Sequence, residues 1–248
     1  MSIYAKFHNS ISSYYAIIKQ QYSAKYIRTT AVGLVILVAL VGGYFLNKFY
    51  VQYREQKAFV ALSEVVDAFT QAQRVTQSLD PQKDQEKIVQ AWQDPEILLD
   101  ALYQEHINSY LAPYFLAFKS QIVLERDHDV SQAIKLLDQA LVSIPKKSEL
   151  GSLYHMKRIK MGFDSEQAAD REHSLQELIK ISQDPKNYSF EEALYLLGVY
   201  YLSVDQAANA QESFQRLADL ADQTALLQSP WVKLAQEKLG IVPQSNVE

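Results

Sequence analysis

The 248-residue chain carries 24 basic and 29 acidic residues, no cysteine, and only seven glycines and seven prolines. Without cysteine, disulfides, thiolate metal sites and thiol nucleophiles are excluded, and so few glycines and prolines disfavour a β-rich fold with frequent turns. Residues before Ala58 hold seven basic and one acidic side chain, a net charge of +6, whereas the rest hold 17 and 28, a net charge of −11. The acidic distal part argues against nucleic acid as a partner, because phosphate binding needs clustered Lys and Arg.

Residues 1–28 contain no Asp or Glu and place apolar and aromatic side chains at steps of three and four. On a helix, side chains at this spacing share one face. We therefore expect a basic, aromatic amphipathic helix that lies in a membrane interface, with Tyr at headgroup depth. A flexible tail is the alternative. The members of the stripe are Tyr4, Phe7, Ile11, Tyr14, Ile18, Tyr22 and Tyr26.

Residues 29–47 form an uncharged run between Arg28 and Lys48. Ten of the 19 residues are Val, Leu, Ile or Phe, which together favour membrane insertion by about 3 to 6 kcal/mol. As a helix the run is roughly 28 Å long, close to the ~30 Å hydrocarbon core of a bilayer. A signal peptide is disfavoured, because 28 residues precede the run and no small-x-small cleavage site follows it. The sequence predicts one uncleaved transmembrane helix.

Charge gives only a slight preference for one orientation of the span in the membrane, because the two sides carry equal numbers of basic residues, three each, within ~20 residues. Lys6 and the α-amine add positive charge on the N-terminal side and so favour a cytoplasmic N-terminus. Within the span, Ala39 and Gly43 form a small-xxx-small pair, which can mark a helix–helix contact but is common in all spans.

Beyond the span, Ala, Leu, Gln, Glu and Lys recur at helical spacing without sustained alternation of period two, so the fold class is expected to be all-α. Residues 48–111 are predicted to form membrane-proximal helices and a linker, 112–240 a repeat domain, and 241–248 a tail. Helices are expected near 82–92, 95–111, 114–126, 131–144, 148–162, 166–183, 189–203, 206–222 and 230–239.

Two stretches, each about 34 residues long, show a similar pattern of small and apolar residues, as in a helical repeat. The clearer one, 191–224, has the small residues Gly198 and Ala210 where two helices would cross, and Phe214 to fill the space between them. The other, 114–147, matches less closely, and the stretch between them cannot be matched position by position. This spacing resembles a tetratricopeptide solenoid of about three helical hairpins with a capping helix at 230–239; an irregular helical bundle is the alternative.

The layout of span and repeats resembles a family of tetratricopeptide-like inner-membrane proteins typified by the ancillary subunit of the bacterial Sec translocon. Locally the resemblance involves the segments Ser109–Ala112 and Gln132–Leu137. It implies a bacterial inner-membrane protein with one span, a cytoplasmic N-terminus and a periplasmic repeat domain. It also implies protein partners, namely translocon subunits, periplasmic chaperones or exported client chains.

Enzymatic motifs are absent from the sequence: it has no G-x-S-x-G, no glycine-rich phosphate loop and no H-E-x-x-H. None of the five histidines forms a metal-binding pair at helical spacing, and Asp127-His128-Asp129 is better explained as a solvated turn. We therefore expect no enzyme, cofactor or metal. If the tetratricopeptide mapping holds, first-helix residues line an apolar groove for a protein segment, unless neighbouring helices cover them. These residues are Phe115, Phe118, Ile122, Glu125, Tyr195, Val199 and Leu202.

Two functions are compatible with these features. The first is a membrane-anchored interaction module beside the protein-export channel that passes emerging chains to periplasmic chaperones. The second is an oligomeric envelope scaffold assembled through the span and the aromatic N-terminal helix.

Overall fold

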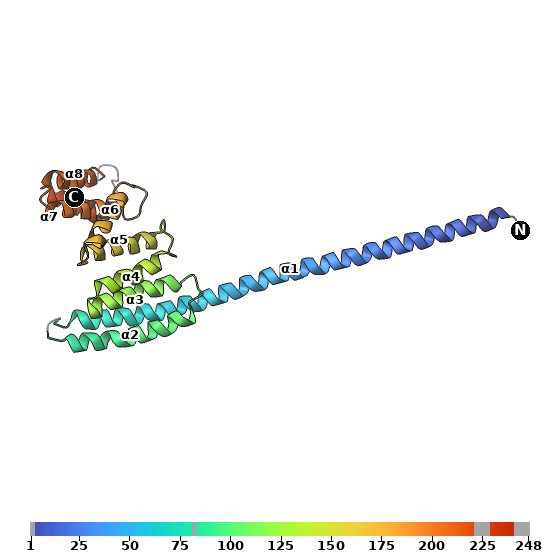
Figure 1. Ribbon diagram of the computed structural model, residues 1–248, viewed down its shortest axis with the longest axis horizontal. Coiled ribbons are helices and arrows are strands. Elements are labelled where there is room, and N and C mark those ends of the chain that lie inside the picture. The colour runs from blue at the N-terminus through green and yellow to red at the C-terminus, as the bar shows by residue number, and fades with distance from the viewer. Residues whose placement is uncertain (1–2, 81–82, 221–228, 241–248) are drawn as a thin grey trace, which may run out of the picture. The chain divides into compact units, whose positions relative to one another are not determined.

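The computed structural model describes residues 3–80, 83–220 and 229–240, and within these ranges all regular secondary structure is helical. The expected all-α fold class is confirmed for this part of the chain. The chain divides into two units, Met1–Lys57 and Ala58–Glu248. Figure 1 labels the helices. Their bounds are α1 Ile3–Gln77, α2 Gln85–Glu105, α3 Ala112–Asp127, α4 Val130–Leu141, α5 Glu149–Phe163, α6 Ala168–Ile181, α7 Phe190–Ser203, α8 Ala207–Ala218 and α9 Pro230–Lys238.

The first unit is the N-terminal part of α1. Its apolar side chains between Leu34 and Leu46 are exposed, and the stretch Leu34–Gln77 contains a window apolar enough to cross a membrane, with none of that window buried. The helix of a soluble core would bury such residues, so their exposure favours the predicted span. Residues 3–28 are helical as expected, but most side chains of the aromatic stripe lie outside the described residues.

The end of α1, from Ala58 on, belongs to the second unit and packs with α2 and α3. Val65, Trp92, Leu99, Phe115 and Ile122 are fully buried in one shared apolar cluster. Residues 48–111, expected as membrane-proximal helices and a linker, therefore contribute their distal part to the core of the folded unit.

Pro95 lies inside α2, so the prediction of separate helices at 82–92 and 95–111 is wrong. A proline lacks one backbone donor and normally interrupts a helix. Here Trp92 and Leu99, on either side of Pro95, are both fully buried. Burial of two large side chains stabilises the continuous helix by several kcal/mol, on the order of 1.5–3 kcal/mol each, which is enough to offset the proline.

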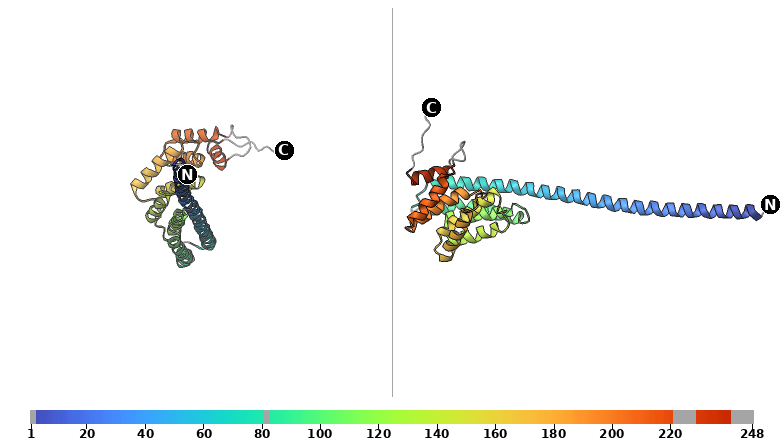
Figure 2. Two further views of the ribbon diagram at one scale, coloured as in Figure 1. Left: turned by 90° about the vertical axis from the view of Figure 1, so that its right-hand side faces the viewer. Right: turned by 90° about the horizontal axis from the view of Figure 1, so that it is seen from above.

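The remaining helices pack mainly against their neighbours in the chain: α3 with α4, α5 with α6, and α7 with α8, while α4–α5 and α6–α7 contacts join these pairs. Figures 1 and 2 show helices α3 to α8 following one another in chain order. The α3–α4 pair is also tied by a buried hydrogen bond in which Ser120 Oγ donates to the Ala133 carbonyl, at 2.7 Å.

The crossing of α7 and α8 matches the steric prediction from the sequence. A Cβ atom at Gly198 would lie only 2.6 Å from Cε1 of Phe214, and Ala210 is buried at the same hairpin. Helix α9 packs on α7 and α8 and begins as predicted, since Ser229 Oγ accepts a hydrogen bond from the Trp231 amide at 3.3 Å. The predicted 241–248 tail lies outside the described residues.

Candidate functional site

Helix α5 presents three polar side chains on one face: Ser152, His155 and Arg158 follow each other at i, i+3 and i+6. Ser148 caps the start of the helix: its hydroxyl donates to the Pro145 carbonyl at 2.7 Å and accepts from the Gly151 amide at 3.0 Å. Any Cβ at Gly151 would lie 2.1 Å from the Pro145 oxygen. The glycine therefore allows the preceding loop to fold closely against the start of α5.

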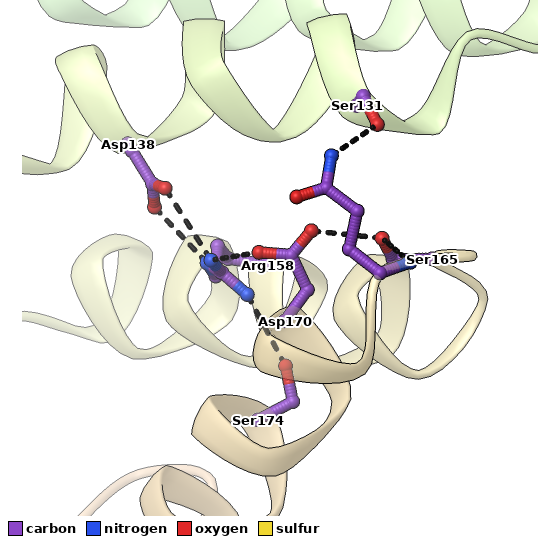
Figure 3. Close-up of polar contacts among 7 residues, drawn as sticks. Ser131, Asp138, Arg158, Ser165, Asp170 and Ser174 are labelled. Carbon is purple, nitrogen blue, oxygen red and sulfur yellow. Dashed lines mark hydrogen bonds and ion pairs between the residues drawn. The ribbon is translucent and has the colours of Figure 1, made fainter.

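Arg158 joins three helices, as Figure 3 shows. Its Nε donates to Asp138 of α4 at 3.0 Å, its Nη1 donates to Ser174 Oγ of α6 at 3.2 Å, and its Nη2 lies 3.6 Å from Asp170 of α6. The arginine is only 7% exposed. A buried guanidinium needs such partners, because an unpaired buried charge is strongly destabilising. This network fixes the positions of α4, α5 and α6 relative to one another.

Two adjoining cavities of about 380 Å³ and 230 Å³ lie beside this network. We call them together the α4–α6 pocket. Both are lined by Lys146, His155, Glu177 and Lys180. The larger is also lined by Asp138, Leu141, Val142, Arg158, Ile159 and His173. The smaller is also lined by Lys147, Ser152, Ile181, Asp184 and Asn187.

Two polar atoms in this region are buried without any hydrogen-bond partner among the described residues: Ser152 Oγ and His155 Nε2. Burial lowers the pKa of His155, and the nearby Lys146 ammonium lowers it further, while Glu177 acts in the opposite direction. The imidazole is therefore neutral at pH 7 and carries one ring proton. Unpaired buried polar atoms cost free energy, so these two can gain from a bound partner.

The predicted groove is only partly open. Phe115 and Ile122 are fully buried in the cluster with α1 and α2, so they line no surface groove, and for these two the prediction is wrong. Phe118 is half-buried, with its ring 5.4 Å from that of Phe69. The groove prediction did not foresee that the end of α1 packs on α3 and covers Phe115 and Ile122. A solenoid that began with α3 would leave this face of α3 open.

The other four residues are more accessible. Glu125 is half-buried and accepts a hydrogen bond from Gln121 at 2.6 Å. Tyr195 is half-buried, with its ring 5.5 Å from that of Trp231. Val199 and Leu202 of α7 are 37% and 46% exposed. Val199 and Leu202 are therefore the most exposed of the seven predicted groove residues.

The residues of the α4–α6 pocket were not selected from the sequence. The polar spacing of Ser152, His155 and Arg158 along one predicted helix is the signal that could have found them, since a core-facing helix normally places apolar residues at such positions. The pocket also contains His155 and His173, which the sequence assigned to different helices. Among the residues that the structure describes, no group of three or more His, Asp or Glu could hold a metal ion.

The described residues define the class: an all-helical fold in which one helix is long and apolar enough to cross a membrane. Comparison with protein-family models, curated proteins and solved structures finds no match to the chain.

Proposed function

We propose that this protein is a membrane-anchored protein–protein interaction module that assists protein export. The observation that carries the proposal is the exposed apolar stretch from Leu34 to Leu46 in a chain whose remainder folds into paired helices. Only about ten residues separate the predicted span from Ala58, where the second unit begins. The anchor would therefore hold the helical domain close to the membrane surface.

The helical domain is proposed to be a tetratricopeptide-like solenoid. In support, helices α3 to α8 pack as three successive pairs, and Gly198 provides the close crossing within the third pair. Helix α9 covers the last pair, as the capping helix of a solenoid does. Solenoids of this kind present extended surfaces to other proteins.

The proposed partners are translocon subunits, periplasmic chaperones or exported client chains. Tyr195, Val199 and Leu202 of α7 provide an accessible surface with both apolar and aromatic character. Such a surface suits an apolar polypeptide segment better than a charged one. The proposed location is the bacterial inner membrane, with the N-terminus cytoplasmic and the helical domain periplasmic.

Topology can be tested cleanly because the chain has no natural cysteine. Lys135 is exposed on α4, so the single variant Lys135→Cys offers one accessible thiol. We expect a membrane-impermeant maleimide to label this thiol in spheroplasts without lysis, while the matched variant Ser12→Cys reacts only after lysis. The reverse pattern would overturn the proposed periplasmic location.

Partners can be tested by photo-crosslinking from position 199 or 202 in the full-length protein in membranes. A crosslinker at Ile97, an exposed apolar residue of α2, is the matched control. We expect translocon subunits, periplasmic chaperones or exported chains to be captured from α7 and not from position 97. Capture of cytosolic proteins alone, or equal capture from both helices, would refute the export function.

An oligomeric envelope scaffold is the second candidate. It is suggested by the small-xxx-small pair Ala39 and Gly43 on the exposed span, where an added Cβ at Gly43 would meet no atom within 4 Å. A partner helix can approach closely at such positions. Under this alternative Gly43→Ile disrupts oligomers in mild detergent, whereas Leu37→Ile at an exposed position of the same helix does not; unchanged oligomers in the first variant would exclude it.

A further inference from the structure

The α4–α6 pocket has unused positive charge. Each of its carboxylates already has a partner: Asp138 accepts from Arg158, Glu177 pairs with Lys180 at 3.4 Å, and Asp184 accepts from the backbone amide of Lys186 at 3.1 Å. Lys146 and Lys147 form no ion pair with any residue that the structure describes. The two cavities are therefore lined by more cationic side chains than carboxylates, namely Lys146, Lys147, Arg158 and Lys180 against Asp138, Glu177 and Asp184, within a domain of net charge −11.

The same pocket has unused hydrogen-bond capacity. Ser152 is only 2% exposed, and its hydroxyl has no hydrogen-bond partner among the described residues. His155 is half-buried, but its Nε2 atom is buried and has no partner among the described residues. Both residues line the smaller cavity together with Lys146. A hydroxyl and an imidazole can each donate one proton to an acceptor placed between them and the ammonium groups.

One part of the pocket wall is apolar. Leu141, Val142 and Ile159 line the larger cavity, and Val142 is 86% exposed, although it is a large aliphatic residue next to charged neighbours. A ligand that places an apolar group here would cover Val142 and leave its charged end beside Lys146. The combined size of the two cavities suits a small organic molecule rather than a single ion.

We propose that the α4–α6 pocket binds a monocarboxylate with an apolar body. The carboxylate would lie against Lys146, Ser152 and His155, and the apolar body against Leu141, Val142 and Ile159. A monoanion fits better than a dianionic phosphate, because Asp138, Glu177 and Asp184 also line the pocket and would repel a second negative charge. The proposal is independent of the export function, since it depends on this pocket alone.

The test measures binding to the full-length protein in mild detergent by isothermal titration calorimetry. The probes are N-acetyl-leucine, its neutral amide N-acetyl-leucinamide, and inorganic phosphate. We expect N-acetyl-leucine to bind with a Kd of about 1 mM or lower, and the amide and phosphate at least tenfold more weakly, because charge-assisted hydrogen bonds are the stronger ones. Equal affinity for acid and amide, or tighter binding of phosphate, would overturn the proposal.

Three variants assign the binding to the pocket. Lys146→Met should weaken the binding of N-acetyl-leucine about tenfold. The control is Lys135→Met, at an exposed position of α4 outside the pocket, which should leave the affinity unchanged. Ser152→Ala separates binding from structure. Loss of an unpartnered buried hydroxyl leaves the protein as stable as before or more stable, so weaker binding in this variant together with an unchanged melting temperature supports a ligand role. Unchanged affinity in both pocket variants would refute the site.

The source of the carboxylate is distinguished by a further probe, N-acetyl-glycyl-glycyl-leucine, which carries the same terminal group on a peptide. Binding at least as tight as that of N-acetyl-leucine would indicate the C-terminus of a polypeptide. Binding of N-acetyl-leucine without binding of the tripeptide would indicate a small free acid. Either result supports the carboxylate site, and failure of both probes to bind would overturn it without bearing on the crosslinking result.

Discussion

The contact between Gly198 and Phe214 allows a quantitative test of how α7 and α8 cross. In the variant Gly198→Ala the new methyl group would lie 2.6 Å from Cε1, 2.8 Å from Cζ and 2.9 Å from Cδ1 of Phe214, where carbon atoms normally approach to about 3.5–4.0 Å. The ring is 3% exposed and packs against Tyr195, with 5.8 Å between the ring centroids. It therefore has little room to move away.

Two opposing terms decide the outcome. Overpacking a buried site costs about 1–3 kcal/mol, whereas replacing glycine by alanine within a helix gains about 1 kcal/mol. We expect Gly198→Ala to lower the free energy of unfolding by about 1 kcal/mol. In the Phe214→Leu background the side chain lacks Cε1 and Cζ, the two atoms nearest the new methyl group, so the same substitution should become neutral or stabilising. A double-mutant cycle should then give a favourable coupling of about 1–2 kcal/mol.

Urea unfolding followed by tryptophan fluorescence measures this cycle, because Trp231 packs in the same apolar cluster as Phe214. The full-length chain in detergent is used for all four proteins. Additive effects of the two substitutions, or stabilisation by Gly198→Ala alone, would refute the steric explanation of the crossing.

Three further substitutions test other parts of the fold by urea unfolding. Arg158→Met should destabilise by about 2–4 kcal/mol, because its carboxylate partners lose their buried cation, whereas the exposed control Lys135→Met should change stability by less than about 0.5 kcal/mol; equal effects would contradict this. Asp129→Ala should cost about 1 kcal/mol, since the Asp129 carboxylate accepts from the Gln132 amide at 2.8 Å, and Asp129→Asn should retain most of that stability. Because burial holds the pKa of His155 below its ordinary value, about 6.5, the unfolded chain takes up this proton first as the pH falls. The contribution of His155 to the free energy of unfolding is therefore fully present above about pH 6.5 and is lost as the pH falls through the folded-state pKa. The variant His155→Gln should make the free energy of unfolding less dependent on pH in this range, and an unchanged slope would contradict this explanation.

Local signals predicted most helices well. The predicted helix 230–239 is observed at Pro230–Lys238, because Ser229 and Pro230 give a strong start signal that depends only on neighbouring backbone atoms. The separate helices predicted at 82–92 and 95–111 are instead one helix, because burial of Trp92 and Leu99 stabilises a continuous α2. The predicted helix 189–203 is observed at Phe190–Ser203, although the Ser189 side chain forms no cap hydrogen bond.

The candidate sites depended on contacts that the sequence does not encode locally. Phe115 and Ile122 were expected in a groove, but residues of α1 about 50 positions earlier in the chain cover them. The α4–α6 pocket combines residues from Asp138 to Asn187 that belong to three helices and two loops. Their proximity follows from helix packing and from the pairing of Arg158 with two neighbouring helices.

The apolar stretch, the helical class and the small residue at the crossing of α7 and α8 could all be predicted from the sequence. These follow from composition, from a period of 3.6 residues and from steric volume, all of which are local properties of the chain. Which apolar faces are covered, and which polar groups in the α4–α6 pocket lack partners among the described residues, became clear only from the packing of the helices. Burial and unsatisfied hydrogen-bonding capacity depend on distances between side chains far apart in the sequence, and packing of the helices sets those distances.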